Sequence, residues 1–266
     1  MHWIAAVVFV AALPAGAAAD MAPALSAAQI VERNIAARGG VEAWRKVDTV
    51  VWSGHVESTP ASAQALPFVL EMKRPNKTHF EITAQRERFL RVFDGVRGWK
   101  LRPNASGIPD VQPFSLDEMK FSREEFIDGP LIDHEAKRIA VSLEGLDEIE
   151  GRKAYRLSVK LPSGAPRRLW IDAETFLDVK HERPSSNPLA SGAAISVFYR
   201  DYRAVGGLQI PHRIETGTRL GNAVNILVIE RATLNAPLND RIFAKPAAPT
   251  KRRATVSIGG DAPWRH

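Results

Sequence analysis

Residues 68–84 read FVLEMKRPNKTHFEITA, and this stretch decides the fold. Large apolar residues occupy every second position before and after the central residues 74–77, which read RPNK. Such strict alternation predicts two half-buried strands of an antiparallel sheet, and the Pro-Asn pair between them predicts a turn. The segment is therefore interpreted as two adjacent strands with one apolar face in common.

The same two-residue period extends outward from this stretch along most of the chain. Asp94-Gly95 is the strongest hairpin signal, and no helix alternates with the strands as parallel sheets require. The further strand segments are residues 50–57, 89–93, 98–101, 140–143, 154–161, 167–172, 177–182, 195–202, 208–216 and 224–234. A sheet of so many antiparallel strands curls toward a barrel. We therefore expect a mainly β fold, with a single curled antiparallel sheet of about eleven strands that forms an unclosed barrel.

Helical patterns occur only before the sheet and once within it. Ser26 is a predicted N-cap, followed by apolar residues at helical spacing as far as the Gly39-Gly40 stop, and residues 41–45 add a short helical turn. Residues 114–138 predict one or two amphipathic helices, the second at 131–137. These helices are placed to cover the curled sheet.

The two ends of the chain differ from the body. Residues 4–13 are apolar, and Ala17-Ala18-Ala19 follows a Pro-Ala-Gly break, which predicts a signal peptide (1–19) cleaved after Ala19. We expect export to the periplasm, a folded domain at 20–246 and a flexible basic tail at 247–266. The alternative interpretation of the N-terminus is an uncleaved apolar helix.

Composition excludes several classes of protein. The chain has no Cys, which excludes disulfides, thiolate metal sites, a cysteine nucleophile and lipid attachment at an N-terminal cysteine. The formal charge of +6 comes from 36 Lys and Arg against 30 Asp and Glu. Half of this excess lies in the tail, so the nearly neutral body predicts no nucleic-acid partner.

The sequence contains no recognisable catalytic motif. Its seven histidines form no pair at i, i+4, and G-x-S-x-G, P-loop and G-x-G-x-x-G patterns are missing. Asp172 and Glu174 could be proposed as paired carboxylates, but Asp172-Ala173-Glu174-Thr175 falls where a hairpin turn is needed. We expect no enzyme activity, no cofactor and no metal.

Large apolar residues are abundant on the predicted strand faces. They can fill an ordinary barrel core, or they can line an apolar cavity under the helices, where each buried methylene contributes about 0.8 kcal/mol. The cavity candidates are Trp52, Phe68, Leu70, Met72, Phe80, Ile82, Phe89, Trp99, Leu101 and Leu157.

A basic cluster surrounds the hairpin at 89–101. Arg88, Arg91 and Arg97 are the candidates for docking an anionic lipid headgroup or an acidic protein partner. The alternative is a solvated sheet face.

Several short segments together resemble a known family. They are ARGGVEAW (37–44), VVWSG (50–54), KRPNK (73–77), FDGVRGW (93–99), GPLID (129–133), LWIDAET (169–175), YRDY (199–202), IPHRI (210–214) and DRIF (240–243). In this order they resemble the outer-membrane lipoprotein-sorting proteins, the LolA/LolB-like periplasmic carriers, over residues 26–246. The resemblance implies an unclosed barrel with a helical lid over a cavity that holds the acyl chains of a lipoprotein or lipid.

Three functions follow as hypotheses. The leading one is a monomeric periplasmic carrier that moves a lipid or acylated protein between membranes, with membrane-bound donor and acceptor proteins as partners. The second is an envelope sensor or protein-interaction module built on the same fold. The third is an enzyme that shapes an apolar substrate in the cavity without a cofactor.

Overall fold

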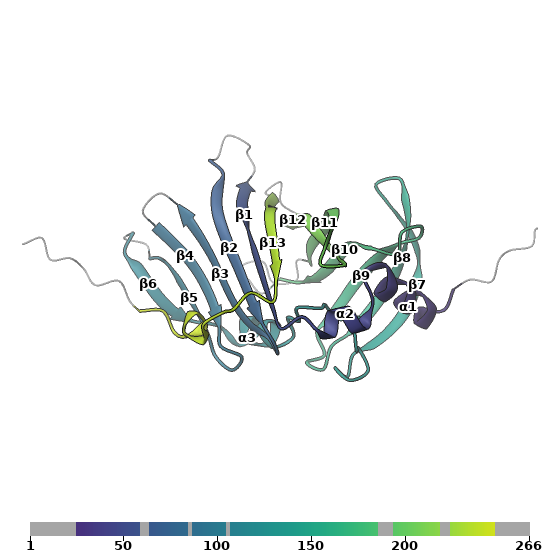
Figure 1. Ribbon diagram of the computed structural model, residues 1–266, viewed down its shortest axis with the longest axis horizontal. Coiled ribbons are helices and arrows are strands. Elements are labelled where there is room, and N and C mark those ends of the chain that lie inside the picture. Colours follow the sequence, from purple (N-terminus) through teal and green to yellow (C-terminus); the bar gives the residue numbers. More distant parts are fainter. Residues whose placement is uncertain are drawn as a thin grey trace, which may run out of the picture.

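One continuous antiparallel sheet forms the body of the protein (Figure 1). The computed structural model describes residues 25–58, 64–84, 87–104, 107–185, 194–218 and 224–247, so the predicted signal peptide and nearly all of the predicted tail lie outside the described residues. Within these ranges the sheet has 13 strands in the order β6-β5-β4-β3-β2-β1-β13-β12-β11-β10-β9-β8-β7. Because β6 and β7 are its edges, the sheet is curled but not closed, as predicted.

The strands lie close to where the alternation places them. Their bounds are β1 Thr49–Ser58, β2 Leu66–Lys73, β3 Lys77–Ala84, β4 Glu87–Phe93, β5 Gly98–Pro103, β6 Pro109–Pro113, β7 Ala140–Ile149, β8 Arg152–Lys160, β9 Pro166–Asp172, β10 Asp178–Pro184, β11 Ala194–Val205, β12 Leu208–Thr218 and β13 Val224–Leu234. The predicted count of about eleven is therefore too low. The strand without a predicted segment is β6, which begins and ends with proline; an edge strand tolerates proline because one side forms no ladder.

The first and last strands pair at the centre of the sheet. Antiparallel pairing joins Val50 of β1 to Leu234 of β13, and a bulge interrupts the register between Ser53 and Gly54. A Cβ atom on Gly54 would lie 1.9 Å from the Val228 carbonyl oxygen, so only glycine allows the two strands to approach this closely. We call the β1–β13 pair the seam.

Three helices and a lid segment cover one face of the sheet. Helix α1 (Ala27–Ala37) has the predicted Ser26 N-cap, whose hydroxyl accepts from the Gln29 amide at 3.2 Å, and α2 (Val41–Arg45) follows. Helix α3 (Leu116–Arg123) begins the lid, which we define as residues 116–139. Residues 127–138 of the lid form turns, so the second helix predicted at 131–137 is wrong. None of the helices that the structure describes is long and apolar enough to cross a membrane.

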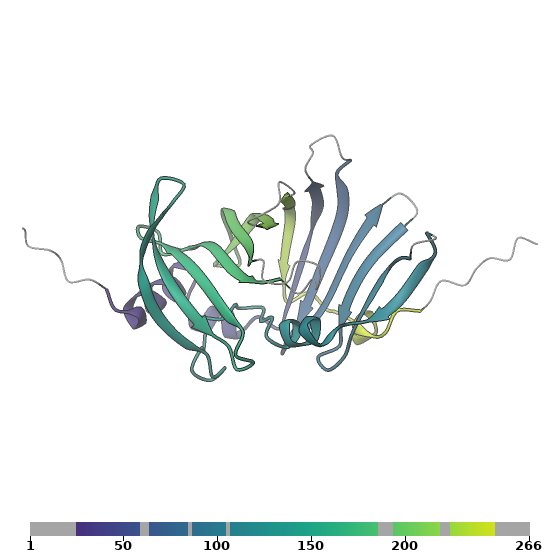
Figure 2. The ribbon, with the colours of Figure 1, turned by 180° about the vertical axis from the view of Figure 1, so that it is seen from behind.

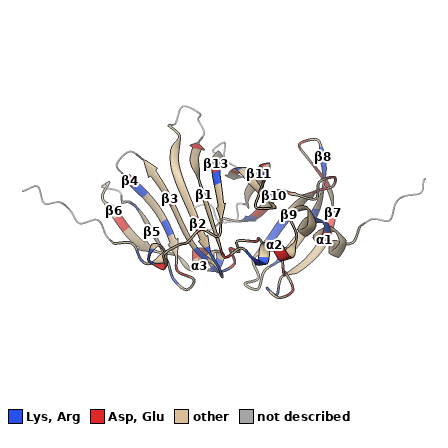
Figure 3. Cartoon of the chain, in the orientation of Figure 1, with Lys and Arg blue, Asp and Glu red and all other residues tan. Residues whose placement is uncertain are grey.

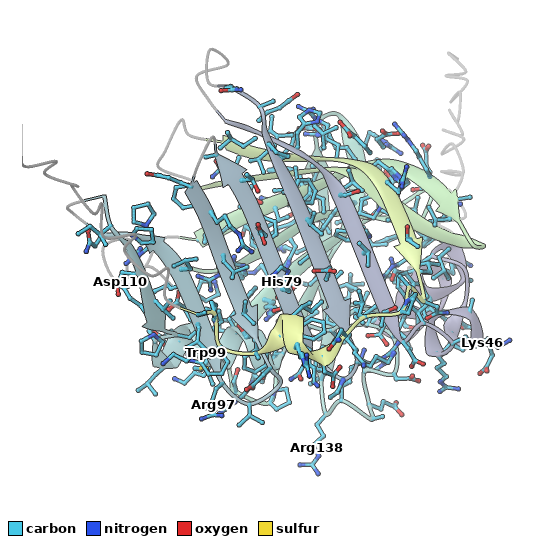
Figure 4. The ribbon with its side chains drawn as sticks, turned by 60° about the vertical axis from the view of Figure 1, so that its left-hand side comes forward. Lys46, His79, Arg97, Trp99, Asp110 and Arg138 are labelled. Carbon is cyan, nitrogen blue, oxygen red and sulfur yellow. The ribbon has the colours of Figure 1, made fainter. Side chains whose placement is uncertain are left out.

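The two faces of the sheet carry different covers. The inner face holds Trp52, Leu70 and Leu169 and lies against α1, α2 and the lid. The outer face is covered near β3–β5 by the 3-10 helix η2 (Asp240–Phe243), whose Phe243 packs with Leu90, Val92 and Leu101. Figures 1 and 2 show α3 and η2 on opposite sides of the sheet, and Figure 4 looks onto the outer face with η2 lying across it.

Candidate functional site

A partly enclosed cavity of about 280 Å³ lies between the inner face of the sheet and the lid. Its floor comes from β1, β2 and β9–β13, and its roof comes from residues 121–130, at the end of α3 and in the turns that follow. These elements come together because the seam places β1 and β2 beside β12 and β13. The cavity is therefore bounded by segments from both halves of the chain.

One wall of the cavity is apolar. Trp52, Leu70 and Met72 point into it because they share the alternating inner face of β1 and β2, and the register pairs Trp52 with Leu70. Ile214 and Leu227, a directly paired couple on β12 and β13, continue this wall. Phe126 and Ile127 close it from the lid side. This wall can accept a hydrocarbon chain.

The opposite wall is polar and contains charged groups. Arg38, Asp178 and Tyr199 lie along it, and the Arg38 Nε is 3.5 Å from an Asp178 carboxylate oxygen. Burial raises the pKa of Asp178, and the nearby Arg38 opposes this shift. Burial likewise raises the pKa of the Tyr199 phenol, which therefore stays protonated at neutral pH. The cavity thus has one apolar side and one side of buried hydrogen-bonding groups.

Two arginines and a phenylalanine form the lid-side end of the polar wall. Arg167 of β9 and Arg183 of β10 lie on the inner face, and their guanidinium carbons are 5.2 and 4.2 Å from the centre of the Phe121 ring of α3. Arg167 is only 6% exposed. Burial lowers the pKa of Arg183, partly offset by Glu125. Both side chains are held by ring contacts of the cation–π type.

His181 lies beside these arginines on the inner face, two residues before Arg183 on β10. It pairs with Leu169 and Val197 in the sheet, and its Nε2 atom is buried with no hydrogen-bond partner among the described residues. Burial, with Arg167 and Arg183 adding repulsion, lowers the pKa of His181 to about 3. The imidazole is therefore neutral at physiological pH and is free to donate or accept one hydrogen bond.

Two ion-pair clusters hold the lid in place. At one end the Glu118 carboxylate accepts from Arg91 at 2.8 Å and from Lys100 at 2.9 Å. Near the middle of the lid, Asp128 accepts from Arg74 at 3.0 Å and from Lys137 at 2.5 Å. The lid is consequently tied to β4 and β5 at its start and to the β2–β3 turn near its middle.

The structure distributes the predicted cavity residues over three environments. Trp52, Leu70 and Met72 line the cavity. The others on the inner face lie beside it: Phe68, Phe80, Ile82 and Phe89 continue the apolar surface over β2–β4, while Leu157 is packed under α1. Trp99 and Leu101 lie on the outer face, where Leu101 contacts the cluster around Phe243 (Figure 4). Ligand contact at any of these residues stays a prediction.

The three candidate docking arginines do not share one surface. Arg88 points to the outer face, where it forms a bidentate pair with Glu81 at 2.7 and 2.6 Å. Arg91 points inward to Glu118, and Arg97 lies in the β4–β5 turn above the Trp99 ring. Basic and acidic residues are interspersed along the sheet (Figure 3). A role of Arg88, Arg91 and Arg97 in docking stays a prediction, and the three side chains do not form one basic patch that would support it.

Other polar groups are explained by local structure. Asp172 caps the β9–β10 turn, as predicted, by accepting from the Glu174 and Thr175 amides.

A larger, shallower hollow of about 570 Å³ lies on the outer face, but its charged side chains pair with one another, as Arg156 does with Asp147. In the described part of the chain no three His, Asp or Glu residues come together as a possible metal site.

Sequence reasoning missed the polar wall. Arg38, Arg167, Asp178, His181, Arg183 and Tyr199 were not candidates. A usable signal was present in β9, where Arg167 occupies the same alternating face as Leu169 and Ile171. A charged residue in the apolar phase of a strand indicates a buried polar site.

Thirteen antiparallel strands that curl around internal helices and a cavity define an unclosed β-barrel of the LolA-like type. A LolA superfamily protein from Nitrosomonas europaea superposes with a TM-score of 0.55 at 18% identity, covering 84% of this chain and 99% of that chain. A putative outer membrane lipoprotein-sorting protein domain from Vibrio parahaemolyticus gives 0.54 at 13% identity, covering 81% and 95%. A DUF1329 family protein from Desulfovibrio piger gives 0.53 at 11% identity, covering 82% and 97%.

These likenesses confirm the fold that the sequence resemblance implied. At such low identities they concern the fold alone. No protein-family model matches the chain, and no curated protein sequence matches it.

Proposed function

We propose that this protein is a periplasmic carrier that holds the acyl chain of a lipid or lipoprotein in its cavity and moves it between membranes. The observation that carries this proposal is the cavity of about 280 Å³ with Trp52, Leu70 and Met72 on its apolar wall. The predicted signal peptide supports export. Membrane-bound donor and acceptor proteins belong to the same proposal, as does a monomeric state.

The size of the cavity is matched to a hydrocarbon chain. At about 30 Å³ for each group of the size of water, it holds on the order of nine such groups. Burying about ten methylenes contributes roughly 8 kcal/mol before the entropy of immobilising the chain is subtracted. Micromolar affinity for an acyl chain requires about 8 kcal/mol net, so contacts with the polar wall or with the neighbouring apolar surface must add to chain burial.

Filling the cavity tests the proposal directly. Leu70 points into the cavity, whereas Val69, its neighbour on β2, lies on the outer face and is 37% exposed. We expect Leu70→Trp to lower the affinity for a fluorescent fatty-acid probe at least tenfold, and Val69→Trp to leave it unchanged. Thermal unfolding of both variants controls for folding. Equal binding by the two variants would contradict a role for this cavity.

The natural cargo can be identified from the purified protein. Denaturing extraction followed by lipid mass spectrometry is expected to release an acyl lipid in near-stoichiometric amount. Protein that is free of lipid and also ignores fatty-acid probes would overturn the proposal.

A protein-interaction module is the second candidate, and the β7 edge favours it. This edge strand pairs only with β8 and exposes Leu146 at 52% and Leu143 at 36%. An unpaired edge can accept a strand from another protein. Substituting Leu146→Lys should abolish such a complex in a pull-down and leave fatty-acid binding intact.

A further inference from the structure

Two arginines in the cavity wall, the buried Arg167 and the partly buried Arg183, have no carboxylate partner among the described residues. Neither Arg167 nor Arg183 forms an ion pair with a carboxylate among the described residues. Both contact the Phe121 ring, and Arg183 also donates a long 3.4 Å hydrogen bond to the Pro184 carbonyl. A buried guanidinium normally meets a carboxylate or phosphate because desolvation of the charge is otherwise uncompensated. The pair therefore indicates a site for an anion that the described residues do not supply.

The acidic residues nearby do not fill this role. Glu124 is engaged by Ser163, whose amide and hydroxyl donate to it at 2.8 and 2.7 Å, and Asp178 is paired with Arg38. Glu125 lies close enough to act on the charge of Arg183, but its Oε2 atom is buried without a hydrogen-bond partner among the described residues. The nearest free carboxylate is thus itself incompletely satisfied.

A neutral donor completes the site. The unpartnered Nε2 of His181 lies on the same inner face, because His181 precedes Arg183 by two residues on β10 and pairs with Leu169, which follows Arg167 by two residues on β9. Two guanidinium groups and one imidazole N–H form the kind of donor set that recognises a carboxylate or a phosphate.

The position of the two arginines also matches an amphiphile. A second hollow of about 210 Å³ on the other side of Phe121 shares Phe121, Glu124 and both arginines with the cavity, and it extends to Lys120 and Asp117 on α3. The arginines therefore lie between the apolar wall and a route to solvent under α3. A headgroup at this point leaves its chain free to lie along Trp52, Leu70 and Met72.

We infer that Arg167, Arg183 and His181 form a headgroup subsite, and that the cargo is a single-chain amphiphile with an anionic oxygen headgroup, such as a fatty-acid carboxylate. This inference rests on the proposed carrier function and narrows its cargo. The cavity volume of about 280 Å³ suits one acyl chain, because pockets for larger ligands span about 300–1,000 Å³. The Phe121 ring lies against both guanidinium groups at the edge of this subsite.

Displacement of a bound fluorescent fatty-acid probe by four compounds of one chain length tests the inference. These competing probes are dodecanoate, dodecyl phosphate, methyl dodecanoate and dodecyltrimethylammonium. We expect one or both anionic probes to bind about 10- to 100-fold more tightly than the neutral ester, since a hydrogen bond to a charged group discriminates by about that factor. Tighter binding of dodecanoate would indicate that the natural headgroup is a carboxylate, and tighter binding of dodecyl phosphate would indicate a phosphate.

Three variants and one matched control locate the effect. Arg183→Gln and Arg167→Gln should each remove most of the preference for the anion while leaving the affinity for the methyl ester unchanged. Arg168→Gln is the matched control, because Arg168 lies on the outer face and pairs with Glu144 at 2.9 Å. Glu125→Gln removes the competing carboxylate and should tighten anion binding, which a purely structural role for the arginines would not produce.

The two proposals fail in different ways. Equal binding of the anionic and neutral probes, unaffected by any of these variants, would overturn the headgroup subsite and leave the carrier function standing. Absence of binding by every probe, the neutral ester included, would overturn the carrier function as well.

Discussion

The Arg91 guanidinium donates to the Glu118 carboxylate at 2.8 Å and so joins β4 to the first helix of the lid. Lys100 of β5 shares the same carboxylate, and the Glu118 side chain is 9% exposed. Burial alone would raise the pKa of Glu118. Hydrogen bonds from the Ser115 amide, Arg91 and Lys100 outweigh it and lower the pKa to about 2. This cluster is the anchor of α3.

Glu118 makes the anchoring of α3 depend on pH. Its pKa in the folded protein is lower than the ordinary 4.5, so its stabilising contribution is complete above about pH 4.5 and is lost as the pH falls toward 2. We expect Glu118→Gln to lower the free energy of unfolding at pH 7 by on the order of 1–2 kcal/mol. The difference from the unsubstituted protein should shrink at pH 3 in urea denaturation. A difference independent of pH would contradict this account.

Asp128 holds the middle of the lid. Its carboxylate is 2% exposed and accepts from Lys137 and Arg74, while burial lowers the pKa of Lys137. Asp128→Asn leaves these cations without an anion, and we expect a loss of about 2–4 kcal/mol in the free energy of unfolding. Glu135→Gln, at an exposed position in the same segment, should change it by less than about 0.5 kcal/mol. Similar effects from both variants would argue against the buried cluster.

The seam depends on the missing side chain of Gly54. Gly54→Ala forces its Cβ against the Val228 carbonyl, a backbone atom that cannot rotate away, and we expect destabilisation of about 3 kcal/mol or more. Gly151→Ala is a useful comparison because Gly151 has a φ of 79° and no atoms near a Cβ. Its cost is backbone strain alone, about 1 kcal/mol. Chemical denaturation of both variants separates the two effects, and equal losses would exclude a close seam.

His181 should remain neutral well below the pH at which an exposed histidine gains its proton. Its pKa in the folded protein is about 3, so NMR of the imidazole nitrogens should show the neutral ring at pH 5. Because the unfolded chain takes up the proton near pH 6.5, this residue lowers stability as the pH falls below that value. Saturation with dodecanoate is expected to raise the pKa, since an anion favours the imidazolium. A midpoint near 6.5 in the free protein would show that His181 is not buried beside the arginines.

Much of the fold follows from local sequence. The alternation in residues 68–84 predicts β2 and β3, the Ser26 cap predicts the start of α1, and Asp94-Gly95 predicts the β4–β5 hairpin. These features depend on neighbours in the chain and are visible without the tertiary structure. In contrast, β6 is recognised only through its pairing with β5. Residues 131–137 form turns that are closed by hydrogen bonds from the Lys137 ammonium to Asp128 and to the Gly129 carbonyl, which helical spacing does not predict.

The cavity could be predicted only in part, and β4 shows why. Phe89 and Phe93 alternate there with Leu90 and Val92, so both faces of the strand are apolar. Leu90 and Val92 form the outer face of β4, which is apolar because η2 covers it. The sequence of β4 alone does not reveal which of its two apolar faces points inward. Leu101 is a predicted cavity residue, but it pairs with Leu90 and lies on the outer face. The polar wall was missed because its members come from α1, β9, β10 and β11 and meet only in the curled sheet.

The seam between β1 and β13 also determines at what stage of synthesis the cavity can be completed. Residues near 50 and near 230 must meet, so no partial chain that ends before β13 has the complete cavity floor. Each half can form by local hairpins, but joining the halves waits for the slow contact between the two ends of the domain. A newly made chain therefore has the complete cavity, and with it the binding site of the proposed carrier, only after its last strand has been released.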